Sequence, residues 1–203
     1  MRFLPAGPTA LLVELDGTDE VLSLSREIER RRRQGWCKSL TDVVPGARTV
    51  LLDGLADAKG AAEEIASWDL GRVPFHGGAV VDVPCRYDGP DLPVVAGHWG
   101  VAEGAIAEIH ASLAHQVAFC GFAPGFAYIE GLGARWQVPR RPSPRPAVPS
   151  GSVALAGTYT GIYPRTSPGG WQLIGSTDLA LWDLRRARPA LLTPGALVRF
   201  VPV

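Results

Sequence analysis

The chain of 203 residues lacks most features that assign a protein at once to a functional class. Its 20 basic and 20 acidic residues cancel, so no net charge attracts nucleic acid or an anionic membrane. Three cysteines and four histidines are scattered without the spacing of metal ligands, which indicates reduced thiols and no metal site. No apolar run approaches the roughly 20 residues that cross a membrane. These absences predict a cytoplasmic protein that binds no nucleic acid, membrane or metal.

Motifs for nucleotide binding and nucleophilic catalysis are also missing. The glycine-flanked run 151–157 invites comparison with a phosphate loop, but it has no Gly-Lys-Ser/Thr ending and precedes a strand. Ser150 and Ser152 lack the Gly-x-Ser-x-Gly elbow of a nucleophilic serine. His115 is open to two interpretations, a base or donor to a substrate and the commoner hydrogen-bonded structural histidine. No catalytic residue follows from the sequence.

Residues 1–77 have the pattern of a small α+β sandwich. Short apolar runs separated by Gly or Pro predict strands, and apolar residues three and four apart predict helices. The order is strand, strand, helix, strand, strand, helix, which suits two helices packed on one antiparallel sheet. The predicted segments are 3–6, 10–14, 21–33, 40–44, 48–52 and 56–68. The loop 71–78 marks a boundary between domains 1–77 and 78–203.

Residues 78–203 become dense in Gly and Pro, which indicates tight turns between short strands that close into a β-barrel. A strand and two helices broken at Gly100 come first, at 79–84, 92–99 and 101–112. Further strands are predicted at 117–120, 151–156, 161–163, 172–175, 181–183 and 197–201. The proline-rich segment 139–149 lacks the N–H donors of a sheet ladder, so we expect it to join no sheet.

Aromatic residues and arginines in this half are candidates for a site. Aromatics inside Gly- and Pro-rich turns either fill a core or line a concave pocket. Arg140, Arg141 and Arg145 lie on the stiff proline-rich segment, and guanidinium forks suit a carboxylate, phosphate or carbamoyl oxygen. The alternative is that they form ion pairs on the surface or at a partner interface. We predict that Arg140 and Arg145 contribute to an anion site.

Several motifs of the chain together resemble the Kip-inhibitor family. They occupy residues 121–128, 139–141, 144–145, 149–154, 160–164 and 167–175, with further matches at 41–46, 194–195 and 200–202. The family includes the B-type component of prokaryotic 5-oxoprolinase, a sporulation-kinase inhibitor, and proteins labelled allophanate hydrolase first subunit. The resemblance implies an α+β fold, with a small N-terminal α+β domain followed by a cyclophilin-like β-barrel.

The resemblance also implies a function and partners. The chain would be the non-ATP-binding subunit of a hetero-oligomeric, ATP-dependent 5-oxoprolinase, which opens the lactam of 5-oxoproline to glutamate. It would pair with a cyclophilin-like subunit of the KipA type, the C-type component of 5-oxoprolinase, and a third, lactam-activating subunit would use the ATP. The alternatives are an inhibitor of a sensor histidine kinase and a carboxyltransferase-like or allophanate hydrolase-like subunit. We expect no activity from the chain alone.

The shared motifs supply the residues expected to bind substrate. These are Phe122, Pro124, Phe126, Arg140, Arg145, Ser152, Tyr163 and Trp171. The chain departs from many relatives in having Thr158 and Tyr159 after Gly157, where they have Gly-Gly-Gln, and Ser176 where they have an arginine, which removes one anion contact. We expect Phe122, Phe126 and Trp171 to be exposed as an apolar patch that a second barrel covers.

Overall fold

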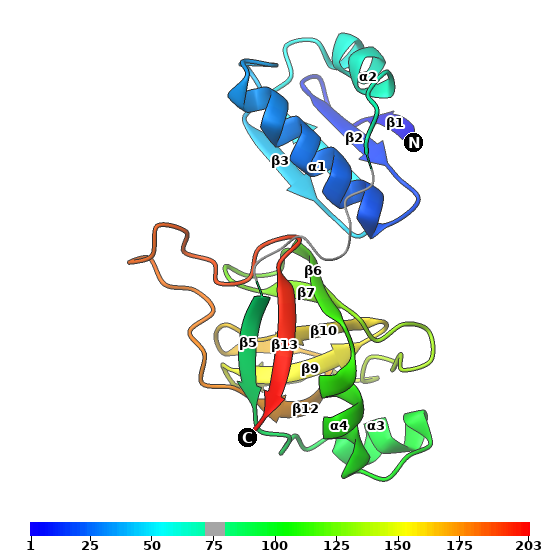
Figure 1. The fold of residues 1–203 in the computed structure, drawn as a ribbon, viewed down its shortest axis with the longest axis vertical. Coiled ribbons are helices and arrows are strands. Elements are labelled where there is room, and N and C mark those ends of the chain that lie inside the picture. The colour runs from blue at the N-terminus through cyan, green and yellow to red at the C-terminus, as the bar shows by residue number, and fades with distance from the viewer. Residues whose placement is uncertain (72–79) are drawn as a thin grey trace. The chain divides into compact units, whose positions relative to one another are not determined.

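The computed structural model describes residues 1–71 and 80–203, which belong to two compact units, Met1–Gly77 and Gly78–Val203 (Figure 1). The predicted domain boundary after residue 77 lies outside the described residues. Across the described ranges, none of the helices combines the length and the apolar character that crossing a bilayer requires.

The first unit has the predicted order of strands and helices. Its four strands form one antiparallel sheet in the order β1-β2-β4-β3. Helix α1 packs on β3 and β4, and α2 packs on β2. The elements are β1 (Arg2–Pro5), β2 (Ala10–Glu14), α1 (Thr18–Arg33), β3 (Asp42–Pro45), β4 (Thr49–Asp53) and α2 (Ala58–Ala66). The α+β pattern predicted for this part of the chain is therefore confirmed.

The alternating side chains of β2 and β4 build the core of this unit. Leu11 pairs with Leu52 and Val13 pairs with Val50, so all four side chains point to the same face of the sheet. That face is buried with the apolar stripe of α1, which includes Ile28. The period-2 and period-3.6 patterns of the sequence thus meet in one core.

The arginine run at the end of α1 is held by acids of the same helix. Glu27 accepts hydrogen bonds from Arg30 and Arg31, and these bonds lower the pKa of Glu27 to about 2. Acids in the first turn and arginines in the last turn also suit the helix dipole. The four arginines at the end of α1 therefore lie on a helix face where acids of the same helix pair with them.

The second unit is built around a seven-stranded sheet in the order β12-β9-β10-β7-β6-β13-β5. A separate two-stranded sheet pairs β8 with β11. The elements are β5 (Val80–Cys85), α3 (Leu92–Trp99), α4 (Ala105–Ser112), β6 (His115–Cys120), β7 (Ala127–Glu130), β8 (Arg145–Val148), β9 (Ser152–Ala156), β10 (Tyr159–Ile162), β11 (Ser167–Gly169), β12 (Gln172–Ser176) and β13 (Leu197–Pro202).

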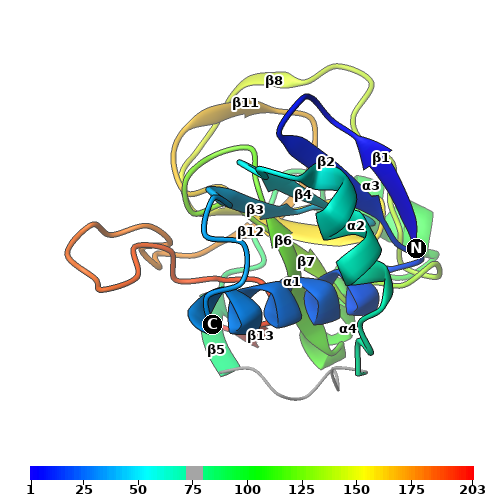
Figure 2. The ribbon, with the colours of Figure 1, turned by 90° about the horizontal axis from the view of Figure 1, so that it is seen from above.

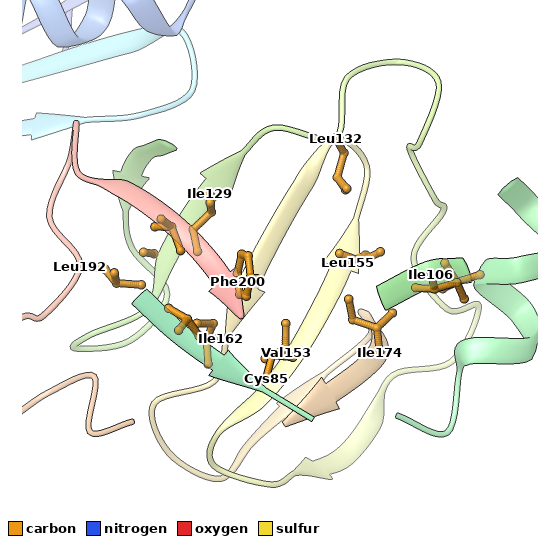
Figure 3. Packing of buried hydrophobic residues seen from close by; sticks show 14 of the residues in the cluster. Cys85, Ile106, Ile129, Leu132, Val153, Leu155, Ile162, Ile174, Leu192 and Phe200 are labelled. Carbon is orange, nitrogen blue, oxygen red and sulfur yellow. The ribbon is translucent and has the colours of Figure 1, made fainter. Parts of the chain in front are cut away.

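The large sheet curls until its two edges meet. Arg86, directly after β5, and Ser176, at the end of β12, exchange two backbone hydrogen bonds of 2.9 and 2.8 Å. Side chains from strands far apart in sequence, such as Cys85, Val153 and Phe200, fill the interior (Figure 3). The fold class predicted from the sequence, α+β with a β-barrel, is confirmed.

The strand predictions in this unit need three corrections. The expectation that residues 139–149 join no sheet is wrong, because β8 pairs antiparallel with β11 (Figure 2). Only Val148 opposite Ser167 and Arg145 opposite Gly169 are in register, so an irregular step accommodates Pro146. Strands β7 and β11 were not predicted, and residues 181–183 form no strand but a single bridge between Trp182 and Ala190.

Two buried histidines form a polar network inside the barrel core. His110 is hydrogen bonded to the Tyr87 hydroxyl at 2.8 Å and to Thr160 Oγ1 at 3.0 Å. His115 Nε2 lies 2.8 Å from the His110 carbonyl oxygen, and both rings contact Phe200. Burial lowers the pKa of both histidines, that of His110 well below its ordinary value. Of the two interpretations of His115, the structure therefore supports the hydrogen-bonded structural histidine.

This network predicts a loss of stability in mild acid. In the unfolded chain a histidine takes up a proton near pH 6.5, whereas folded His110 stays neutral, so the unfolded state binds more protons as the pH falls. The free energy of unfolding should fall by about 1.4 kcal/mol per pH unit for each such histidine below pH 6.5. Urea unfolding between pH 8 and pH 5.5 measures the slope, which should be smaller in His110→Gln. An identical slope in the variant would contradict the assignment.

The close contact that completes the barrel predicts that one glycine, Gly175, cannot be replaced without a loss of stability. A Cβ at Gly175 would overlap the carbonyl oxygen of Arg86 and lie 3.1 Å from Cys85 Sγ. Gly175→Ala should lower the free energy of unfolding by about 1–3 kcal/mol, because the backbone must shift to admit the methyl group. Gly97 in α3 is the matched control, since a Cβ there meets nothing within 4 Å. Gly97→Ala should leave stability unchanged or raise it, and equal losses from the two changes would refute the argument.

Candidate functional site

Aromatic side chains from three segments of the second unit form one cluster. Phe126 makes edge-on contacts with Tyr163, Trp171 and Phe122, at ring-centroid distances of 5.5, 5.6 and 5.2 Å. Gly161 makes room for them, because a Cβ there would lie 2.7 Å from Phe126 and 2.8 Å from Trp171. Such edge-to-face packing is the favoured geometry of aromatic pairs. The cluster is a second packed core beside the barrel interior.

The expected exposure of these rings is only partly correct. Phe126, Tyr163 and Trp171 are buried, whereas Phe122 is 58% exposed. The prediction that Phe126 and Trp171 form an open apolar patch is therefore wrong, because the neighbouring rings of the cluster cover them. Phe122 also has a positive φ of 66°, a conformation that a non-glycine residue adopts only at some cost in free energy. Its ring and the exposed Pro124 lie on the loop between β6 and β7.

A buried carboxylate fixes the arginines of the proline-rich segment. Asp91 is 3% exposed, and its Oδ1 accepts hydrogen bonds from Arg141 Nη1 at 2.9 Å and from Arg145 Nη2 at 2.8 Å. Its Oδ2 accepts a hydrogen bond of 2.6 Å from the backbone N–H of Leu173 in β12. One carboxylate thus joins the start of α3, the proline-rich segment and the barrel wall.

Asp91 was not found by sequence reasoning. An acid directly before an apolar run with proline at its second position suggests a helix N-cap. Asp91 does occupy that position, but its side chain makes no capping hydrogen bond. Its oxygens bind donors 50, 54 and 82 residues away instead. The local sequence around Asp91 predicts only a helix N-cap, which is not the role of its side chain.

Arg140 and Tyr163 add polar groups at the edge of the aromatic cluster. The Arg140 guanidinium lies 6.0 Å from the centre of the Trp171 ring, at the outer limit of a cation–π contact. Burial raises the pKa of Tyr163, although the nearby charges of Arg140 and Arg145 oppose the shift. The Tyr163 hydroxyl therefore stays protonated at neutral pH. A side chain at Gly169 would overlap this hydroxyl, which explains the glycine there.

The structure brings most of the predicted site residues together. Phe122, Phe126, Tyr163, Trp171 and Arg140 are linked by ring or cation–π contacts. Arg145 lies near Tyr163 but is paired with Asp91. Ser152 is buried in β9, where its carbonyl accepts the Tyr163 N–H at 3.0 Å. Pro124 lies on the exposed loop. Their role in binding a substrate stays a prediction.

Other features of the unit offer little catalytic chemistry. Burial raises the pKa of the Cys85 thiol to about 12 and that of Cys120 to about 11, so neither is a thiolate at neutral pH. Within residues 1–71 and 80–203, no three or more His, Cys, Asp or Glu side chains are grouped to hold a metal ion. A cavity of about 380 Å³ is lined by Ser150, Gly151, Pro164 and residues 177–182. The arrangement suits holding an anion better than attacking a bond.

Three comparisons place the chain among known proteins. The family model described as carboxyltransferase domain, subdomain C and D, matches residues 1–192. A protein named as the B-type component of 5-oxoprolinase, from Escherichia coli O157:H7, is 39% identical over 203 residues, which are 97% of this chain and 93% of that protein. The crystal structure of TTHA0988 superposes with a TM-score of 0.80 at 32% identity, over 96% of this chain and 39% of that one. The Kluyveromyces lactis urea carboxylase shares the fold at 19% identity, with a TM-score of 0.74 over 99% of this chain and 21% of that one.

The Asp91 cluster predicts a large stability effect. Asp91→Ala should lower the free energy of unfolding by about 3 kcal/mol, because it leaves two partly buried guanidinium groups without their counter-charge. Asp82 is the matched control, since it pairs with Arg199 through two hydrogen bonds but on the surface. Asp82→Ala should change stability little, because water screens exposed pairs. Urea unfolding of both variants measures the difference, and similar losses would contradict the prediction.

Proposed function

Since the chain belongs to the carboxyltransferase domain family of subdomains C and D, we propose that it is the B-type component of a 5-oxoprolinase. The proposed reaction is the ATP-dependent opening of the 5-oxoproline lactam to glutamate. The observation that carries the proposal is the 39% identity to a B-type 5-oxoprolinase component over nearly the whole length of both chains. The resemblance to the Kip-inhibitor family, stated from the motifs, is confirmed by the same matches.

The chemistry of the described residues supports a positioning role for this chain. Opening an unstrained lactam needs an activated nucleophile or an activated carbonyl group. Tyr163 is held as a neutral phenol, the thiols of Cys85 and Cys120 are protonated, and His110 and His115 are enclosed in the barrel core. Arginines and aromatics can orient a substrate without activating it. We therefore assign the use of ATP to another subunit.

A multi-subunit assembly is consistent with the share of each longer relative that this chain matches. This chain spans 39% of the TTHA0988 chain and 21% of the K. lactis urea carboxylase, so the same unit is also found as a minor part of longer chains. We propose that the partner is a paired cyclophilin-like subunit and that a third subunit activates the lactam.

The three free cysteines support a cytoplasmic setting for this assembly. Cys37, Cys85 and Cys120 form no disulfide. Free thiols persist in the reducing cytosol, where ATP is also at hand. We propose the cytoplasm as the compartment.

The proposal predicts activity only in combination. Glutamate release from 5-oxoproline should be absent with the purified chain, and should appear when the cyclophilin-like partner, a lactam-activating subunit and ATP are added. Mixtures that omit this chain, one partner or ATP are the controls. Robust turnover by the chain alone would reveal an active site of its own. No turnover with any partner, together with binding to a sensor histidine kinase, would replace the proposal by the inhibitor alternative.

A further inference from the structure

We propose that Arg141, Arg145 and Gln172 form a binding site for a small molecule that carries both a carboxylate and an amide. Asp91 is the positioning residue of this site, because it holds the two arginines in place. The site lies between the proline-rich segment and β12. The inference rests on the proposed function. It adds Asp91, which lies outside the shared motifs, and gives Arg141 and Gln172 a binding role that the motifs did not assign to them.

The first observation is a concentration of unpartnered polar atoms. In the part of the chain that the structure describes, Arg141 Nε, Arg145 Nη1 and Gln172 Oε1 are buried and have no hydrogen-bond partner. Buried polar groups are nearly always paired, because an unpaired one loses its hydration without compensation. Three such atoms at one interface indicate that something else supplies the missing hydrogen bonds.

The orientation of Gln172 is fixed by its neighbour. The residue is only 4% exposed, and its Nε2 donates to the Pro139 carbonyl oxygen at 3.1 Å. A carbonyl oxygen only accepts hydrogen bonds, so the amide nitrogen must face Pro139 and the amide oxygen must face away from it. The unpartnered Oε1 is consequently an acceptor in a determined position. A ligand with an N–H group would donate the hydrogen bond that Gln172 Oε1 lacks.

The arginines are equally fixed. The Arg141 backbone N–H donates to the Gly170 carbonyl oxygen at 2.7 Å, which ties the segment to the chain just before β12. One nitrogen of each guanidinium group is bound to Asp91 Oδ1, and a second nitrogen of each, Arg141 Nε and Arg145 Nη1, is buried without a partner. These two donors call for oxygen acceptors on the ligand. Planar guanidinium groups suit carboxylate oxygens in particular.

The charge of the cluster selects for a monoanion. Two guanidinium groups share one carboxylate, so the cluster of Asp91, Arg141 and Arg145 carries a surplus of one positive charge. 5-Oxoproline carries one carboxylate, one lactam oxygen and one lactam N–H. It therefore matches the surplus charge, the two donors and the single acceptor. 2-Pyrrolidinone has the lactam without the carboxylate, and urea is neutral.

Equilibrium binding tests this site separately from turnover. L-5-Oxoproline is titrated into the full chain, and into the complex with its partner subunits, and Kd is measured for the wild type and two variants. Gln172→Met removes the acceptor at similar size, and Arg141→Lys keeps the charge but loses the fork. Each should raise Kd about tenfold or more, as expected for the loss of a hydrogen bond to a charged or buried group. Arg165→Lys, at an exposed arginine, is the control and should leave Kd unchanged.

The outcomes separate the site from the proposed function. Binding that weakens in both variants, with no glutamate release by any assembly, would keep the site and overturn the proposed function. Turnover with Kd and KM unchanged in both folded variants would overturn the site and keep the proposed function. Equal affinity for 2-pyrrolidinone, or no saturable binding to either preparation, would also overturn the site. Thermal unfolding confirms that each variant is folded.

Discussion

The site region depends on the buried carboxylate of Asp91. Removing a charged carboxylate from water costs several kcal/mol unless opposite charges and hydrogen-bond donors replace the lost hydration. Asp91 obtains them from Arg141, Arg145 and the backbone N–H of Leu173. The proline-rich segment pairs with β11 at only two positions in register. Its arginines, bound to Asp91, therefore hold it against the barrel.

The barrel gives this anchor its rigidity. Strand β12 is hydrogen bonded to β9 along one side, and its end closes the barrel through Arg86 on the other. The same strand supplies the Leu173 N–H to Asp91 and carries Gln172. Glycine at position 175 is a condition of this arrangement, because any side chain there would collide with the Arg86 backbone. The position of the site thus follows from the closure of the sheet.

The aromatic cluster and the polar group of Arg141, Arg145 and Gln172 have different roles in this region. Phe126, Tyr163 and Trp171 are packed against one another and stabilise the loops that carry them. The arginines and Gln172 supply unpartnered polar atoms at the neighbouring interface. Phe122 alone of the four central rings is presented to solvent. The proposed binding site therefore belongs to the polar edge, and the aromatic rings pack beside it.

The sequence by itself determined the elements whose signal is local. The apolar periodicity of β2, α1 and β4, the two helices that end and restart around Gly100, and the Gly- and Pro-rich half of the chain led to an α+β fold with a barrel. Only the tertiary structure decided the burial of Phe126 and Trp171, the pairing of β8, and the role of Asp91. Periodicity and turn preferences depend on residues a few positions apart, whereas the partners of Asp91 are 50, 54 and 82 residues away. Which donors reach a buried carboxylate is settled only when the barrel closes, because closure places segments from distant parts of the chain around it.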